Sequence, residues 1–136
     1  MQNDEMERLL NEIGRLVAGS RADQANKTLL HAEVGSNMVA PSIFEDLGDH
    51  VQYRDADLDL SYALLDLWEI PSVDKRWAEI EYLISGNEFD AKFIFPEEIN
   101  LDEDPLARRG KVVERYFGKK PVTYPPPSAD IPEYKP

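Results

Sequence analysis

The sequence of 136 residues contains no cysteine, which excludes disulfide bonds and thiolate metal sites. Its only two histidines, His31 and His50, have no glutamate at helical spacing, which argues against a zinc site. No apolar run approaches the roughly 20 residues that a membrane-spanning helix needs. The first ten residues, MQNDEMERLL, lack the basic and apolar regions of a signal peptide, so we expect a cytoplasmic protein.

Basic residues are also scarce. There are 15 Lys and Arg against 27 Asp and Glu, which gives a formal net charge of -12 at pH 7. This imbalance disfavours nucleic acid as a partner, because affinity for nucleic acid comes from neutralising its phosphates. It favours a partner with a basic surface, because complementary potentials accelerate and orient docking.

Hydrophobic periodicity predicts elements in the order α-β-β-β-α-β-β-α. Apolar residues at three- and four-residue spacing predict an amphipathic helix over residues 4–18. A second helix over residues 58–68 is apolar nearly all round and is expected to be buried. Alternation predicts three strands between the two helices, and Pro41 marks the second of them as an edge or bulged strand. These strands cover residues 27–34, 38–44 and 50–54.

The most informative stretch begins at Trp77. Aromatic and aliphatic residues alternate on both sides of Ser85-Gly86-Asn87, which predicts a β-hairpin. An acidic connector follows the hairpin. Asp104 is then predicted to cap a helix that begins at Pro105 and ends at Gly118.

Short connections make sequential strands neighbours in a sheet. We therefore predict a single α+β domain over residues 1–120, with an antiparallel sheet of about five strands and helices packed on one face. Residues 121–136 are rich in proline and are predicted to form an extended, polyproline-type tail.

The C-terminal half resembles the YezG-like antitoxin family, the immunity proteins of bacterial polymorphic toxin systems. The resemblance rests on the strand led by Trp77, the Ser85-Gly86-Asn87 turn and the strand end Phe93-Ile94-Phe95. It continues through the acidic connector and a helix rich in arginine and aromatics, which closes on Tyr116-Phe117-Gly118-Lys119-Lys120-Pro121. These motifs are structural and bring no catalytic residue. They imply an immunity protein that binds a cognate secreted or contact-delivered toxin domain, expected to be a nuclease, and occludes its basic active-site surface.

Two groups of residues are expected to contact such a partner. Alternation along the first hairpin strand predicts a central, exposed patch with an aromatic anchor, made of Trp77, Glu79 and Glu81. The connector is expected at the surface because too few basic residues are available to bury its carboxylates. These are Glu97, Glu98, Asp102, Glu103 and Asp104, of which two could instead serve the start of the helix. No cofactor or metal is expected, and the oligomeric state stays open.

Two other functions are open from the sequence. One is a small metal-dependent nuclease, in which Glu79 or Glu81 with Asp90 would hold Mg²⁺ and Lys92 would steady the reacting water. The simpler interpretation of those residues is a cross-strand Glu–Lys pair. The other function is a non-enzymatic adaptor whose proline-rich tail docks into an aromatic groove.

Overall fold

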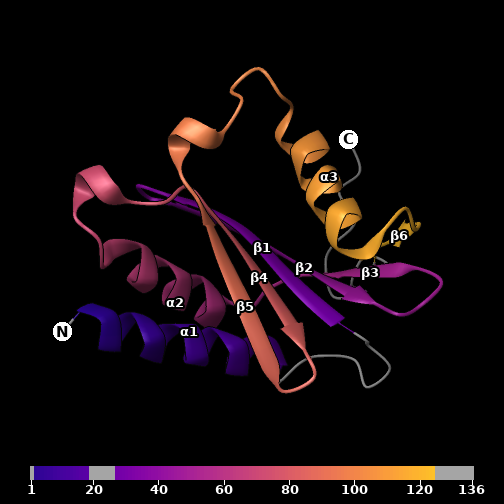
Figure 1. The fold of residues 1–136 in the computed structure, drawn as a ribbon, viewed down its shortest axis with the longest axis horizontal. Helices are drawn as coiled ribbons and strands as arrows, with labels where there is room; N and C mark the ends of the chain where they lie inside the picture. The colour runs from indigo at the N-terminus through magenta and orange to yellow at the C-terminus, as the bar shows by residue number, and fades with distance from the viewer. Residues whose placement is uncertain (1, 19–26, 125–136) are drawn as a thin grey trace, which may run out of the picture.

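A computed structural model of the chain describes residues 2–18 and 27–124. These residues form three α-helices, six strands and two short 3-10 helices (Figure 1). In chain order they are α1 (Gln2–Ala18), β1 (Lys27–Gly35), β2 (Met38–Asp46), β3 (Val51–Arg54), α2 (Leu58–Glu69), η1 (Val73–Lys75), β4 (Glu79–Ser85), β5 (Glu88–Ile94), η2 (Pro96–Glu98), α3 (Pro105–Phe117) and β6 (Val122–Thr123). The predicted polyproline conformation beyond residue 124 lies outside the described residues.

The strands form one sheet in the order β5-β4-β1-β2-β3-β6. Neighbours are antiparallel except β3 and β6, which pair in parallel. The predicted α+β class with an antiparallel sheet is therefore confirmed. The sixth strand, β6, lies where the sequence predicts only an extended tail. It joins the sheet because the N–H of Val51 donates to the carbonyl of Pro121 at 2.9 Å, which draws Val122 alongside β3.

Pro41 is tolerated in β2 because it stands at an open edge, one of the two possibilities that the sequence indicates. Pro41 stands opposite Ala32 of β1, whereas β3 pairs only with the end of β2 from Ile43 to Asp46. Among the described residues, β2 therefore has an open edge at Pro41, where a missing N–H interrupts no ladder.

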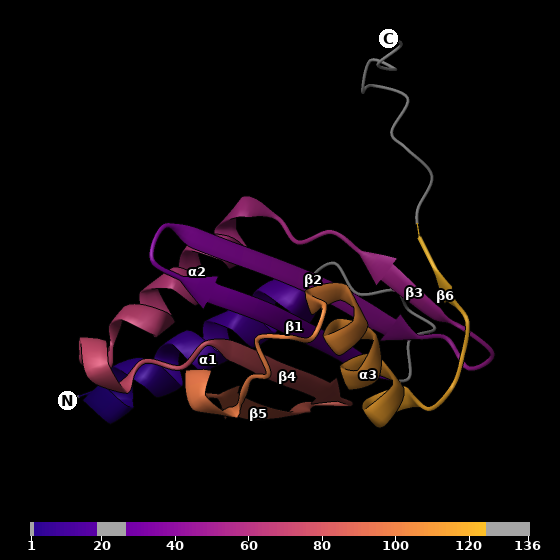
Figure 2. The same ribbon diagram turned by 90° about the horizontal axis from the view of Figure 1, so that it is seen from above.

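The two faces of the sheet are covered by different helices. Helices α1 and α2 pack together on one face, against side chains that include Leu30 and Ile80. The prediction placed the helices on one face only, and α3 departs from it. Helix α3 crosses the opposite face and packs against Leu29 and Phe44 (Figures 1 and 2). Adjacent strand residues point to opposite faces, and Leu29 and Leu30 are both apolar, so β1 is buried on both sides.

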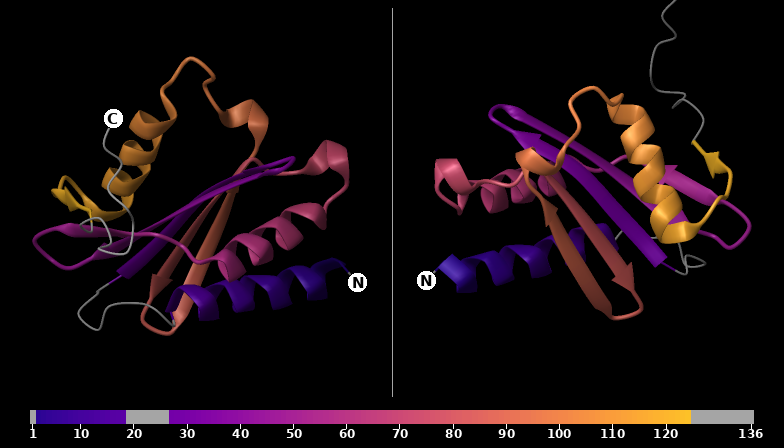
Figure 3. Two further views of the ribbon diagram at one scale, coloured as in Figure 1. Left: turned by 180° about the vertical axis from the view of Figure 1, so that it is seen from behind. Right: turned by 45° about the horizontal axis from the view of Figure 1, so that its top comes forward.

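Helix α2 is not buried all round, and that prediction is wrong. One side of it packs on the sheet through Leu60, Ala63, Leu64 and Leu67. Its other side faces outward and exposes large apolar side chains. The helix lies in the outer layer of the molecule, and among the described residues no further layer covers it (Figure 3).

Candidate functional site

Trp77 is a core residue, so the prediction that it is an exposed anchor is wrong. Its side chain is only 2% exposed and packs on Phe93 with the ring centroids 5.2 Å apart. The indole Nε1 of Trp68 donates to the Trp77 carbonyl at 2.8 Å. Strand β4 begins only at Glu79, so the alternation of the strand does not extend back to Trp77.

Glu79 is likewise buried rather than exposed. It lies on the sheet face that α3 covers, and the Nε2 of His31 donates to its Oε1 at 2.9 Å. The guanidinium of Arg108 contacts its other oxygen as an ion pair without hydrogen-bond geometry. Burial by itself raises the pKa of Glu79, but the bond from His31 and the charge of Arg108 outweigh it, and the pKa is lowered.

Glu81 is held in the same way by residues about two turns further along α3. Arg115 donates to its Oε1 at 2.5 Å, and the hydroxyl of Tyr116 donates to the same oxygen at 2.7 Å. Burial and the hydrogen bond to Glu81 raise the pKa of Tyr116 to about 12. The predicted exposed patch is therefore replaced by a buried ionic layer that fastens α3 to the sheet.

Arginines of α3 make further contacts with the sheet. Arg108 also bonds Glu33 at 2.9 Å. Arg109 donates to the hydroxyl of Ser42 at 3.1 Å and lies over the ring of Phe44, with 5.5 Å between guanidinium carbon and ring centroid. The sequence gives one sign of this ionic layer. Alternation places two strand glutamates on one face, and a basic helix follows them in the chain.

The residues of the alternative nuclease are not assembled into a metal site. Lys92 stands opposite Glu81 in the register, yet the ion-pair partner of Glu81 is Arg115. Asp90 stands opposite Leu83 at an exposed position. An arginine of α3 already neutralises each of these buried glutamates. Within the described residues, no group of three or more His, Cys, Asp or Glu is placed to hold a metal ion.

The acidic connector lies at the surface, as predicted, and forms an arch between β5 and α3 (Figure 1). Some of its carboxylates have local structural roles. Glu98 accepts the N–H of Phe95 at 2.9 Å, and Glu103 pairs with Lys111. Asp104 caps α3 by accepting the N–H of Ala107 at 3.1 Å, and this cap is confirmed.

The remaining connector carboxylates are free to meet a partner. Glu97 and Asp102 are exposed, and neither side chain has an ion pair or hydrogen bond among the described residues. Between them stands Leu101, which is 91% exposed, and Leu106 at the start of α3 is also exposed. The sequence analysis identified neither leucine as exposed. We call residues 97–106, which combine free carboxylates with exposed leucines, the acidic crest.

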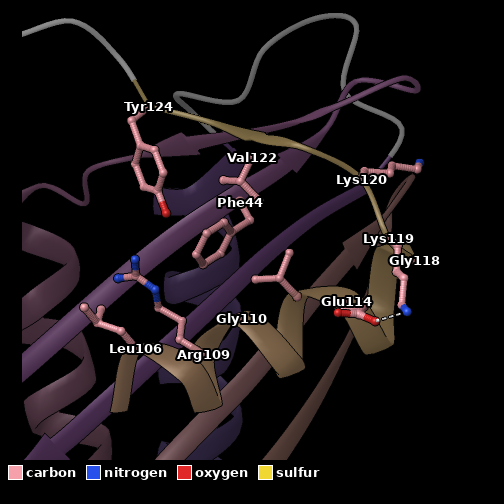
Figure 4. Close-up of a pocket in the computed structure, with 11 residues that line it drawn as sticks. Phe44, Leu106, Arg109, Gly110, Glu114, Gly118, Lys119, Lys120, Val122 and Tyr124 are labelled. Carbon is pink, nitrogen blue, oxygen red and sulfur yellow. Dashed lines mark ion pairs between the residues drawn. The ribbon is translucent and has the colours of Figure 1, made fainter. Parts of the chain in front are cut away.

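A hollow of about 210 Å³ lies between α3, Phe44 of β2 and the segment of β6 (Figure 4). Two of the basic side chains that line it pair with carboxylates of the protein. Lys120 bonds Asp46 at 2.8 Å, and Lys119 lies 3.9 Å from Glu114. Burial raises the pKa of Asp46, but the bonds from Lys120 and from the N–H of Gly48 outweigh it, so the net shift is downward. Cations at the end of α3 also complement its dipole, so this hollow serves structure.

The chain matches no known family model and no curated protein. The resemblance to the YezG-like antitoxins therefore rests on the motifs quoted above. No helix among the described residues is both long enough and apolar enough to cross a membrane.

Proposed function

We propose that this chain is an immunity protein that binds a basic toxin domain in the cytoplasm and occludes its active-site surface. The toxin is expected to be a nuclease. The observation that carries the proposal is the acidic crest, where the free carboxylates of Glu97 and Asp102 flank the exposed side chain of Leu101.

The chemistry of the crest suits such a target. A nuclease presents basic side chains that bind phosphates, and carboxylates can occupy the same positions. Glu97 and Asp102 would break no internal bond when they meet those cations. Leu101 would supply the apolar centre that protein interfaces need, because such interfaces place apolar contacts inside a polar rim.

The crest is supported on both sides by fixed structure. At one end, η2 is closed by the bond from the Phe95 N–H to Glu98. At the other end, α3 is capped by Asp104 and attached to the sheet through Arg108 and Arg115. A loop that is already ordered loses less conformational entropy on docking, and affinity rises accordingly.

Binding rather than catalysis is proposed because the carboxylates best placed for metal chemistry have other partners. Glu79 is held by His31 and Arg108, and Glu81 by Arg115 and Tyr116. The proposed mechanism needs no cofactor. It requires only that the crest covers the toxin's cleft.

The test is protection of cells that express the toxin domain encoded by the neighbouring gene. The wild-type chain should restore growth, and a Glu97→Lys, Asp102→Lys variant should not, because it places cations against a basic cleft. Glu88→Lys with Asp90→Lys is the matched control, since it makes the same charge change at exposed positions of β5. Full protection by a folded crest variant, confirmed by its melting temperature, would contradict the proposal.

A further inference from the structure

The outward side of α2 exposes two large apolar side chains. Leu58 is 65% exposed and Tyr62 is 58% exposed. They lie four residues apart and are therefore neighbours on the helix surface. The opposite side of the same helix packs on the sheet. Among the described residues, this apolar surface has no covering element.

Negative charge surrounds this surface. The flanking carboxylates are all exposed and belong to Asp55, Asp59, Asp66 and Glu69. An open hollow of about 550 Å³ lies beside them where α1 and α2 meet, and it is lined by Glu5, Arg8, Asp66, Glu69 and Ile70. Residues 2–18 and 55–69 together contain nine acidic and two basic side chains, a net charge of -7.

The layer formed by α3 carries net positive charge, but ion pairs within the molecule neutralise that charge. Residues 105–120 contain six basic side chains and one acidic side chain. Arg108 and Arg115 bind carboxylates of the sheet, and Lys120 binds Asp46. The negative charge of the molecule is therefore concentrated on the α1–α2 layer and on the crest.

We propose that the outward face of α2 is a second docking surface, which binds a protein segment that carries apolar side chains flanked by Lys or Arg. The apolar residues would cover Leu58 and Tyr62, and a long basic side chain would enter the hollow lined by Asp66 and Glu69. A second copy of this chain is disfavoured as the occupant, because it would bring two faces of like charge together.

This surface lies across the sheet from the crest (Figures 1 and 3). A partner on α2 would not obstruct a partner on the crest. The inference therefore goes beyond the proposed immunity function and does not depend on it.

The experiment titrates the full-length protein with a synthetic amphipathic helix of leucine and lysine, and follows backbone amides by NMR. Shifts are expected at residues 58–69, with little change at residues 97–106. Leu58→Ser with Tyr62→Ser should weaken binding at least about tenfold, the scale expected when an anchor is removed. Leu101→Ser with Leu106→Ser is the matched control and should bind as the wild type does.

A second variant tests the flanking negative charge separately from the apolar residues. Asp59→Lys with Asp66→Lys should also weaken binding and reduce its dependence on salt, because it removes the flanking negative charge. The melting temperature checks that each variant is folded. The proposal would be overturned by shifts confined to the crest, by unchanged affinity in both α2 variants, or by a dimer that Leu58→Ser with Tyr62→Ser abolishes.

Discussion

Replacing Arg108 by methionine should destabilise the fold much more than the same change at Lys111, three residues along the same helix. Arg108 bonds Glu33 at 2.9 Å and also contacts Glu79, whose side chain is 3% exposed. Lys111 is largely exposed and, among the described residues, pairs only with Glu103. Methionine keeps much of the aliphatic length of both side chains, so the comparison isolates the charge.

The expected magnitudes follow from burial. Removing one partner of a buried ion pair leaves an uncompensated charge and costs about 3–5 kcal/mol. Glu79 keeps its bond from His31, so we expect the lower end of that range, about 3 kcal/mol, for Arg108→Met. A surface pair such as Lys111–Glu103 contributes about 0–1 kcal/mol. Because domains have roughly 5–15 kcal/mol of stability, the Arg108→Met variant should still fold.

Urea denaturation measures the difference, with the free energy of unfolding taken from the midpoint and slope. Adding Glu79→Gln to Arg108→Met should recover part of the loss, because the stranded carboxylate is then neutral. Equal losses for Arg108→Met and Lys111→Met would refute the reasoning, as would a double variant that is no more stable than Arg108→Met alone.

Three further outcomes follow from the buried contacts. Folding lowers the pKa values of Glu79 and Asp46, so both carboxylates stabilise the fold above the unfolded pKa of about 4. This stabilisation is lost as pH falls through the folded pKa. Denaturation at decreasing pH should show the loss, and Glu79→Gln should show a shallower decline. Trp77→Ala should cost about 3–5 kcal/mol in urea denaturation, and a loss below about 1 kcal/mol would contradict its core position. Gly14→Ala should destabilise by about 1–3 kcal/mol in the same assay, because a Cβ there would lie 2.5 Å from the Tyr82 hydroxyl; an unchanged midpoint would refute that contact.

Local signals in the sequence were sufficient for most of the fold. The turn at Ser85-Gly86-Asn87 joins β4 to β5, and Gly86 has the positive φ that such a turn requires. Asp104 and Gly118 bound α3 as their capping chemistry indicates. These features depend on neighbours in the chain, which is why sequence patterns alone could predict them.

The candidate site was less predictable because it depends on packing between distant segments. Alternation correctly placed Glu79 and Glu81 on one face of the strand, but it could not show that α3 covers that face. The arginines that make this burial possible lie about 30 residues further along the chain. Leu101 presents the opposite problem, since nothing local to an apolar residue shows whether another element will cover it.

We propose that this chain acts by binding a basic partner through the crest. The most direct measurement is the affinity and association rate of the purified chain for the toxin domain encoded by the neighbouring gene, at low and at high salt. We expect a tight one-to-one complex whose association slows as salt rises, and which the Glu97→Lys, Asp102→Lys variant fails to form. Absence of any complex at low salt would contradict it.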